Sequence, residues 1–377
     1  MLVNERSYIY FSIVVSFVVY VALATINVSF RVPGFNYIVV VVLAFLTLIG
    51  IIFFDKIKLS SLLFLLVFST LGCMGYFAST IDVGAMFSFF YLLLVSTMII
   101  LIRWVKPSED EIIKVVTLCF YMYLVMSIFT FFVYKSHYRE FSFNGLILER
   151  AFHGIEGSPA NIDTFTTLFF LMVIFSSSMK RMVKVGHAMV CIGIVYFCDT
   201  QTPLLIIITW AGYLLVNLIF RDFSRRIIIA GMYLVMLLVF YLSLNNKFFY
   251  DVLIFITNGR NYIWNEQIIN VFSDLSLVDI WFGDFTNAYV AIHWSEDDTN
   301  NPHNGYIFLL IRLGLVVTSI FLAYVFYISK HLNQLQYFIL ISLLAASVSN
   351  SNVFYLSNPI ITFLLVYSFL PKMRSRN

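Results

Sequence analysis

The sequence predicts an all-α polytopic membrane protein with about twelve transmembrane helices. Of its 377 residues, 61% are apolar and only 11% are charged. Soluble domains are close to half apolar and a quarter charged, so this composition excludes the ordinary soluble class. The chain also contains 41 Phe and 23 Tyr residues, which suit lipid-facing and interfacial helix surfaces.

Each predicted span approaches the roughly 20 apolar residues that a bilayer requires. The first, Ser7 to Asn27, is longer than the core of a signal peptide, so we expect it to be retained. Residues 135–160 and 245–304 form two long loops, and the whole chain, 1–377, is expected to be one integral membrane domain. The predicted spans are 7–28, 35–54, 59–79, 83–102, 112–134, 161–179, 185–199, 203–220, 227–244, 305–328, 335–352 and 354–370.

The positions of Lys and Arg predict the orientation, because cytoplasmic loops carry an excess of them. If both termini are cytoplasmic, most of the 23 basic residues lie on that side and both long loops face outward. The small net charge of +3 gives no indication of a nucleic-acid partner. Arg312 falls within a span, and the basic residues left on the outer side are Arg31, Lys135, Arg139, Arg150, Lys247 and Arg260.

Neither the cysteines nor the acidic residues indicate a metal site. The sequence has no CxxC pair, and its acidic run at 296–298 has no second acidic cluster to complete a set of ligands. Buried thiols that act as small apolar side chains are the favoured interpretation for Cys73, Cys119, Cys191 and Cys198. We therefore expect no metal and no cofactor.

A polar stretch just before the span at 305–328 is the strongest candidate for a functional site. His303 and Asn304 are the last polar residues before an apolar segment that carries Arg312. On a helix, Arg312 would lie about 13 Å beyond His303. A charge at that depth is costly unless it faces a polar cavity or a partner. We expect this helix to have one polar side, although a His at the membrane interface is the alternative.

Both long loops carry further candidates beside predicted helices. In "GSPAN", Pro159 is suited to begin a helix that Ser158 caps, with Arg150 before it and Asn161 in its first turn. In "GRNYIW", Arg260 precedes a short helix with one apolar face, suited to lie on the membrane surface. Arginine binds phosphate oxygens in a bidentate manner. An ordinary capped helix and a solvated interfacial arginine are the alternatives.

Taken together, these stretches resemble the bacterial O-antigen polymerase (Wzy) and O-antigen ligase families. His303-Asn304, nine intervening residues and Gly314 fit the pattern H[NSQ]-x9-G that both families share. "GRNYIW" is similar to the GR-x-x-x-W that opens the large outer loop in these families, which aligns the family arginine with Arg260. "GSPAN" resembles a stretch of the polymerases before about the sixth span.

The chain departs from the family pattern at two positions. Val317 stands where the pattern has a small or aromatic residue. Gln201, in "CDTQTPLL", stands where the family often has the arginine of T-x-S-R-T. If that arginine contacts lipid pyrophosphate, then Arg139, Arg150 or Arg312 must supply its charge. The resemblance covers the C-terminal two-thirds, and the first 130 residues match by hydropathy alone.

The resemblance implies a metal-independent glycosyltransferase with a GT-C-like helical bundle in the bacterial inner membrane. Such enzymes of lipopolysaccharide biosynthesis use oligosaccharides carried on undecaprenyl pyrophosphate at the periplasmic face. His303 would be the general base, or would orient the acceptor hydroxyl. Arg260 and Arg150 would hold the pyrophosphate. The other expected substrate-binding residues are Asn304, Arg312, Arg139, Asn161, Gln201 and Tyr306.

A polymerase is the favoured hypothesis, because "GSPAN" and the low Gly and Pro content match polymerases better. A ligase, which transfers the glycan to lipid A-core, shares the His motif. A lipid-linked oligosaccharide flippase or other transporter is the alternative from a different class. It would predict charges in several spans and repeat symmetry, and we find neither. Expected partners are undecaprenyl-pyrophosphate-linked oligosaccharides and membrane lipid, with a chain-length regulator protein as a further candidate and no nucleic acid.

Overall fold

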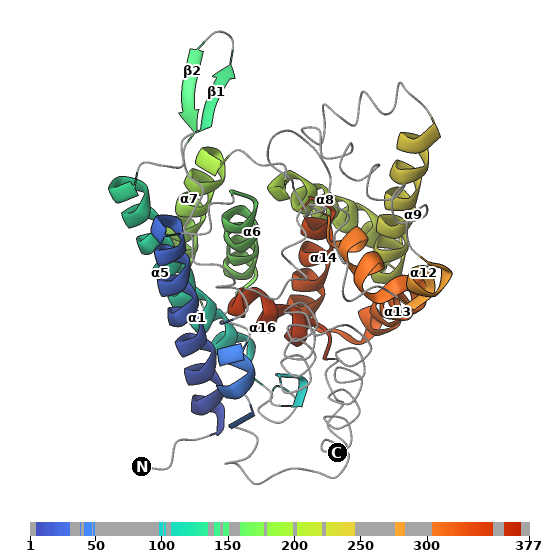
Figure 1. Ribbon diagram of the computed structural model, residues 1–377, viewed down its shortest axis with the longest axis horizontal. Coiled ribbons are helices and arrows are strands. Elements are labelled where there is room, and N and C mark those ends of the chain that lie inside the picture. Colours follow the sequence, from blue (N-terminus) through green and yellow to red (C-terminus); the bar gives the residue numbers. More distant parts are fainter. Residues whose placement is uncertain are drawn as a thin grey trace. The chain divides into compact units, whose positions relative to one another are not determined.

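The structure, a computed structural model, consists of helices and one two-stranded sheet in the residues that it describes (Figure 1). Four of these helices are long and apolar enough to cross a membrane: Glu109–Val133, Arg181–Cys198, Thr202–Ile219 and Gly314–His331. These are the properties of a helical membrane protein. The described residues are 5–30, 38, 41–46, 48–49, 98–100, 102, 107–134, 139–143, 146–150, 159–176, 179–198, 202–220, 224–245, 276–282, 304–349 and 358–370.

The chain divides into two compact units. Unit 1 combines Met1–Ala78, Met86–Pro203 and Leu356–Leu370. Unit 2 combines Ser79–Ala85, Leu204–Tyr355 and Pro371–Asn377. Both units therefore contain segments that are distant in the sequence, and the single integral membrane domain stays a prediction.

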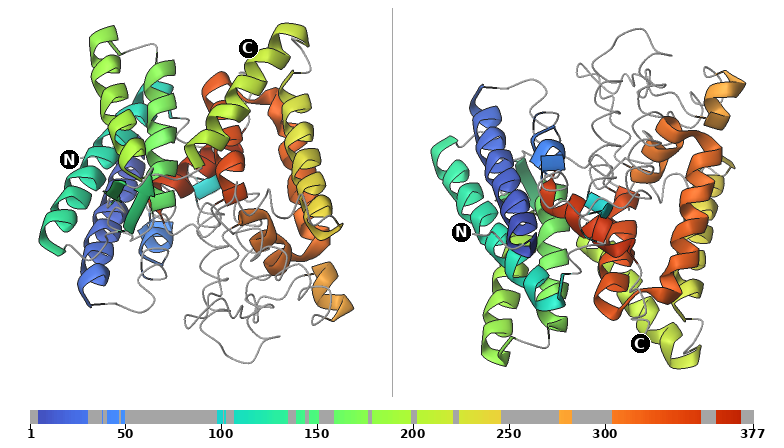
Figure 2. Two further views of the ribbon diagram at one scale, coloured as in Figure 1. Left: turned by 90° about the horizontal axis from the view of Figure 1, so that it is seen from above. Right: turned by 90° about the horizontal axis from the view of Figure 1, so that it is seen from below.

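In unit 1, each helix packs against one or two others. Helix α1 contacts α5 and α16, α5 contacts α6, and α6 contacts α7; Figure 2 shows α1 and α5 side by side. A capping box starts α5, because Ser108 N donates to Glu111 Oε2 at 2.8 Å and Glu111 N donates to Ser108 Oγ at 3.3 Å. The bounds are α1 Glu5–Phe30, α5 Glu109–Tyr134, α6 Pro159–Phe175, α7 Arg181–Cys198 and α16 Pro359–Ser368.

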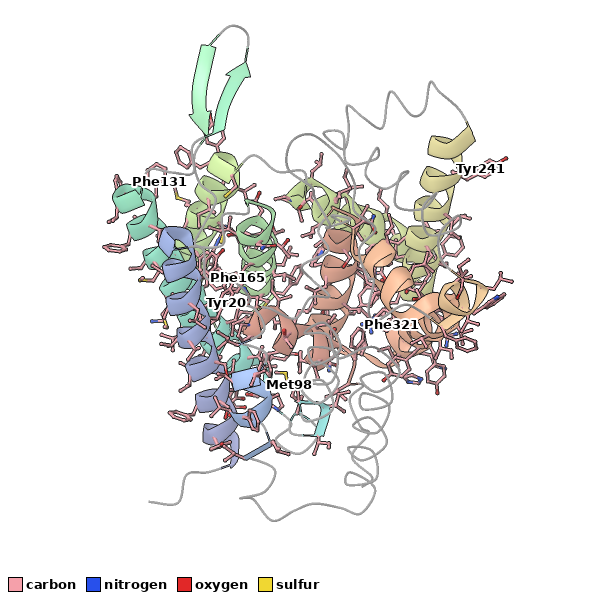
Figure 3. The ribbon with its side chains drawn as sticks, viewed as in Figure 1. Tyr20, Met98, Phe131, Phe165, Tyr241 and Phe321 are labelled. Carbon is pink, nitrogen blue, oxygen red and sulfur yellow. The ribbon has the colours of Figure 1, made fainter. Side chains whose placement is uncertain are left out.

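Aromatic side chains fill the core of unit 1. Phe120 of α5 stacks on Phe169 of α6, with ring centroids 4.1 Å apart. Phe165 of α6 meets Phe17 of α1 edge to face at 6.1 Å. Tyr20 of α1 is also fully buried, and Figure 3 labels both Tyr20 and Phe165. Such offset and edge contacts are the arrangements that aromatic rings prefer.

Unit 2 is centred on α13, which contacts α9, α12 and α14, while α14 also contacts α9. Trp210 of α8 stacks on Phe338 of α14 with centroids 4.0 Å apart, and its Nε1 donates to Ser342 Oγ at 3.3 Å. All but the first residues of α8 belong to this unit. The bounds are α8 Thr202–Ile219, α9 Ser224–Asn245, α12 Leu277–Phe282, α13 Gly305–Ile328, η1 Ser329–His331 and α14 Gln334–Ser349.

Helices α1, α5 to α9, α13, α14 and α16 each lie on a predicted span. The helix α16 is shorter than the span predicted at 354–370, because Asn358 caps it through the backbone N–H groups of Ile360 and Ile361 and Pro359 occupies its first position. The predicted spans at 35–54, 59–79 and 83–102 lie largely outside the described residues. A total of about twelve spans therefore stays a prediction.

Each predicted outer loop contains a short regular element. In the first loop, β1 (Arg139–Phe143) and β2 (Leu146–Arg150) form an antiparallel hairpin, which adds a sheet to the predicted all-α fold. In the second loop, α12 exposes apolar side chains such as Leu277 and Trp281. The surface helix predicted after Arg260 lies outside the described residues.

Candidate functional site

The structure describes the predicted site residues to different extents. Asn161, Asn304 and Tyr306 have described side chains. Arg139, Arg150 and Arg312 are placed by their backbone alone. His303, Arg260 and Gln201 lie outside the described residues, so their roles stay predictions.

Asn304 is a buried N-cap that ties α13 to α14. Its backbone is extended, with φ −143° and ψ 119°, and its Oδ1 accepts hydrogen bonds from Tyr306 N at 2.9 Å and Ile307 N at 3.1 Å. Its Nδ2 donates to Val348 O at 2.9 Å. Its expected contact with substrate stays a prediction. The side chain uses its acceptor and its donor within the protein, so the cap alone accounts for an Asn here.

Tyr306 provides a second link between the same two helices. Its hydroxyl donates to Leu344 O at 2.9 Å, and the side chain is buried. The first turn of α13 is therefore held against α14 by Asn304 and Tyr306 together. His303 immediately precedes this fixed turn in the sequence.

Gly314 breaks α13 into two helical segments. Its φ of 69° and ψ of 175° are outside the helical region and are essentially restricted to glycine. A break frees backbone carbonyls, which must find partners where water is excluded. Thr318 Oγ1 donates to Leu309 O at 3.1 Å, so a side chain after the break bonds to the helix segment before it. The glycine of the H[NSQ]-x9-G pattern thus has a structural cause, and Arg312 lies two residues before the break.

The hairpin pairs like charges across its strands. Arg139 lies opposite Arg150, and Glu140 lies opposite Glu149 at the next register position. Like charges directly opposite each other destabilise a strand pair. The register therefore brings two basic positions together at this end of the hairpin and two acidic positions together beside them.

The first turns of α6 contain a buried polar cluster. The helix begins at Pro159, as predicted, and both Asn161 and Asp163 are buried. The Cys198 thiol of α7 and Tyr123 of α5 both lie near the Asp163 carboxylate. Asn161 packs in the protein interior beside this cluster, and its predicted contact with substrate stays a prediction.

The predicted site residues are divided between the two units. Arg139, Arg150 and Asn161 belong to unit 1, whereas Asn304 and Arg312 belong to unit 2. Their convergence on one site stays a prediction. Within the described ranges, no group of three or more His, Cys, Asp or Glu side chains could hold a metal ion.

Sequence reasoning missed Thr318 and the backbone conformation at Gly314. A glycine inside an otherwise continuous apolar helix is the signal that could have indicated a break. Comparisons of the chain with family models, with curated proteins and with solved structures found no match.

Proposed function

We propose that this protein is an O-antigen polymerase, a glycosyltransferase that joins repeat units carried on undecaprenyl pyrophosphate. The reaction would take place at the periplasmic face of a bacterial inner membrane. The proposal draws on the ordered motifs around Arg150, Arg260 and His303, and on the helical membrane fold. A GT-C-like bundle of about twelve spans, with both termini in the cytoplasm, is part of the same proposal.

The observation that carries the proposal is the register of the β1–β2 hairpin. It pairs Arg139 with Arg150 in the long loop that precedes α6. A lipid-linked donor presents a pyrophosphate group, whose oxygens suit two guanidinium groups because each one donates in a bidentate manner. Two positive charges at these positions would also stabilise the charge that develops as the carrier leaves.

The proposed chemistry is a displacement at the anomeric carbon of the donor sugar. A hydroxyl of the acceptor sugar forms the new glycosidic bond, and the bond between the donor sugar and the pyrophosphate breaks. The hydroxyl proton passes to His303, whose ordinary pKa suits proton transfer near neutral pH. Undecaprenyl pyrophosphate leaves, held by Arg150 and Arg260. Asn304 supports this role indirectly, because it fixes the helix turn that follows His303.

The break in α13 favours a second candidate, a transporter for lipid-linked oligosaccharides. Discontinuous membrane helices often form the binding sites of transporters. Here the break at Gly314 lies two residues beyond Arg312. A transporter would bind the same pyrophosphate group but would leave the glycan unchanged. A test must therefore detect bond formation between repeat units.

A complementation experiment tests the proposal. The gene is deleted in its host and restored as wild type, His303→Ala or Arg260→Ala, with membrane levels checked by immunoblot. We expect the deletion strain to carry core plus a single repeat unit, the wild type to restore the lipopolysaccharide ladder, and neither variant to do so. Lys180→Gln, which removes an exposed charge on the expected cytoplasmic side, is the matched control and should restore the ladder.

The other outcomes separate the alternatives. Bare core with polymer left on the lipid carrier would identify a ligase. Lipid-linked single units trapped on the cytoplasmic side would identify a flippase. Full rescue by both His303→Ala and Arg260→Ala would contradict the assignment of the site.

A further inference from the structure

Four basic side chains lie together at one end of α9, α13 and α14 in unit 2. Arg225 and Arg226 occupy the first turn of α9, and Lys330 and His331 lie in η1, which contacts both α9 and α13. Figure 2 shows α9 beside α13. The four helical elements α9, α13, η1 and α14 contain no Asp or Glu in their sequences. Arg221 and Asp222, which precede α9, lie outside the described residues.

Arg225 fixes the geometry of this basic cluster. Its Nη1 donates to Leu332 O at 2.5 Å, and its guanidinium lies 5.1 Å from the centroid of the Tyr337 ring. The Tyr337 hydroxyl donates back to Arg225 O at 3.1 Å. These contacts hold the start of α9 against the turn between η1 and α14. The Arg225 guanidinium therefore already has partners within the protein.

Arg226, unlike Arg225, has a guanidinium nitrogen without a hydrogen-bond partner among the described residues. Its guanidinium lies 5.5 Å from the centroid of the Phe326 ring, and its buried Nε has no hydrogen-bond partner among the described residues. A buried donor without a partner is costly, and the charge of the partly exposed Arg226 side chain has no carboxylate in these helical elements to offset it. Two arginines in the first turn of α9 also add positive charge at the positive end of the helix dipole. An anion at this position would offset both effects.

The remaining cations face the solvent around one tyrosine. Lys330 Nζ lies 5.5 Å from the centroid of the Tyr327 ring, and the His331 ring lies 5.6 Å from it. Lys330, His331 and Tyr327 are all exposed. Tyrosine and lysine at a helix end are the residues that meet lipid headgroups.

We propose that Arg226, Lys330 and His331 bind the phosphate of an anionic phospholipid headgroup. The occupant is a lipid rather than a soluble phosphate because apolar surface adjoins the cations. Ile227, next to Arg226, is 37% exposed. About 12–15 Å further along the helices, Leu234 of α9 and Ile320 of α13 are 67% and 63% exposed, so acyl chains would find apolar side chains beyond the bound headgroup. The distribution of Lys and Arg places this end on the cytoplasmic side of the membrane. This site is independent of the proposed polymerase chemistry.

Native mass spectrometry of the purified full-length protein tests the proposal. The protein is titrated with phosphatidylglycerol and with phosphatidylcholine of the same acyl chains, and the ratio of the two affinities is measured. We expect a preference for phosphatidylglycerol that falls on the order of tenfold in Arg226→Gln/Lys330→Gln. The control Lys180→Gln/Arg181→Gln removes two exposed cations from unit 1 and should keep the preference.

Further variants and a competitor make the result decisive. Lys330→Gln alone should lower the preference by a smaller factor, and it serves if the double variant does not fold. Arg226→Lys should keep part of the preference, because it retains the charge but loses the planar Nε donor. An unchanged preference in the folded double variant would overturn the proposal. So would an equal loss in the control, or displacement of the lipid by millimolar inorganic phosphate.

Discussion

At the scale of single residues, Asn304 holds the start of α13. It accepts two backbone hydrogen bonds in α13 and donates one to Val348 O of α14. We expect Asn304→Ala to lower the free energy of unfolding by about 2 kcal/mol, from the lost cap and the lost inter-helix bond. The measurement is the apparent melting temperature in detergent, followed by size-exclusion chromatography after heating.

The substitution Asn304→Ser separates the two contributions. Serine keeps a cap acceptor but is too short to reach Val348 O, so we expect about half of the loss. If neither variant changes the melting temperature, Asn304 has no stabilising role. Its place in the motif would then reflect contact with substrate.

Gly314 holds the backbone break inside α13. An L-residue at φ 69° and ψ 175° is strained, so Gly314→Ala should destabilise the protein by about 1–3 kcal/mol. Gly231 of α9 is the matched control, because an added Cβ there would meet no atom within 4 Å. Gly231→Ala should therefore be neutral or stabilising by up to about 1 kcal/mol. Equal melting temperatures for the two variants would contradict the break in α13.

The sequence reveals these two residues to different degrees. A polar Asn directly before an apolar run predicts an N-cap, which Asn304 confirms. The sequence cannot show that its amide also reaches Val348, because that contact depends on how α14 packs. Gly314 is visible as a motif position, but the sign of its φ angle is set by the folded backbone. Thr318, which bonds across the break to Leu309 O, has no sequence signal of its own.

At the scale of elements, the hairpin in the first outer loop offers a direct test of register. Ser142 lies opposite Ile147, so cysteines at these positions should form a disulfide because their Cα atoms are close. The pair Ser142→Cys with Leu148→Cys is shifted by one residue and should not form one. Peptide mass spectrometry under non-reducing conditions distinguishes the two. Efficient cross-linking of the shifted pair alone would contradict the register that places Arg139 opposite Arg150.

The two loop elements differ in how far the sequence predicts them. Asn144-Gly145 between two short apolar-rich runs is a strong hairpin signal, and it was available in the sequence. The position of α12 is harder to predict, because six residues carry too little periodicity to define a helix.

At the scale of the whole molecule, the charge distribution predicts the topology. We expect green fluorescent protein fused after Asn377 to fluoresce, because the C-terminus is predicted to be cytoplasmic. Alkaline phosphatase inserted between Asn144 and Gly145 should be active, because the first long loop is predicted to face outward. An active phosphatase fused after Asn377 would place the C-terminus outside and would contradict the predicted orientation.

The helical membrane class follows from composition alone, since 61% apolar residues and 11% charged residues fit no ordinary soluble domain. The locations of most described helices also follow from apolar length, as α5 and α13 show. The division into two units does not, because it depends on contacts between distant segments such as α1 and α16. The proposed convergence of Arg150, Arg260 and His303 would also depend on long-range contacts, which hydropathy does not encode.

The most direct test of the central proposal is polymerisation by the purified protein. The protein is reconstituted in lipid nanodiscs with a single repeat unit carried on undecaprenyl pyrophosphate, and the lipid-linked products are resolved by mass spectrometry. We predict products of two or more repeat units together with released undecaprenyl pyrophosphate, and neither product with His303→Ala. Donor that stays at one repeat unit with the wild-type protein, or that is consumed only when lipid A-core is added, would contradict the polymerase proposal.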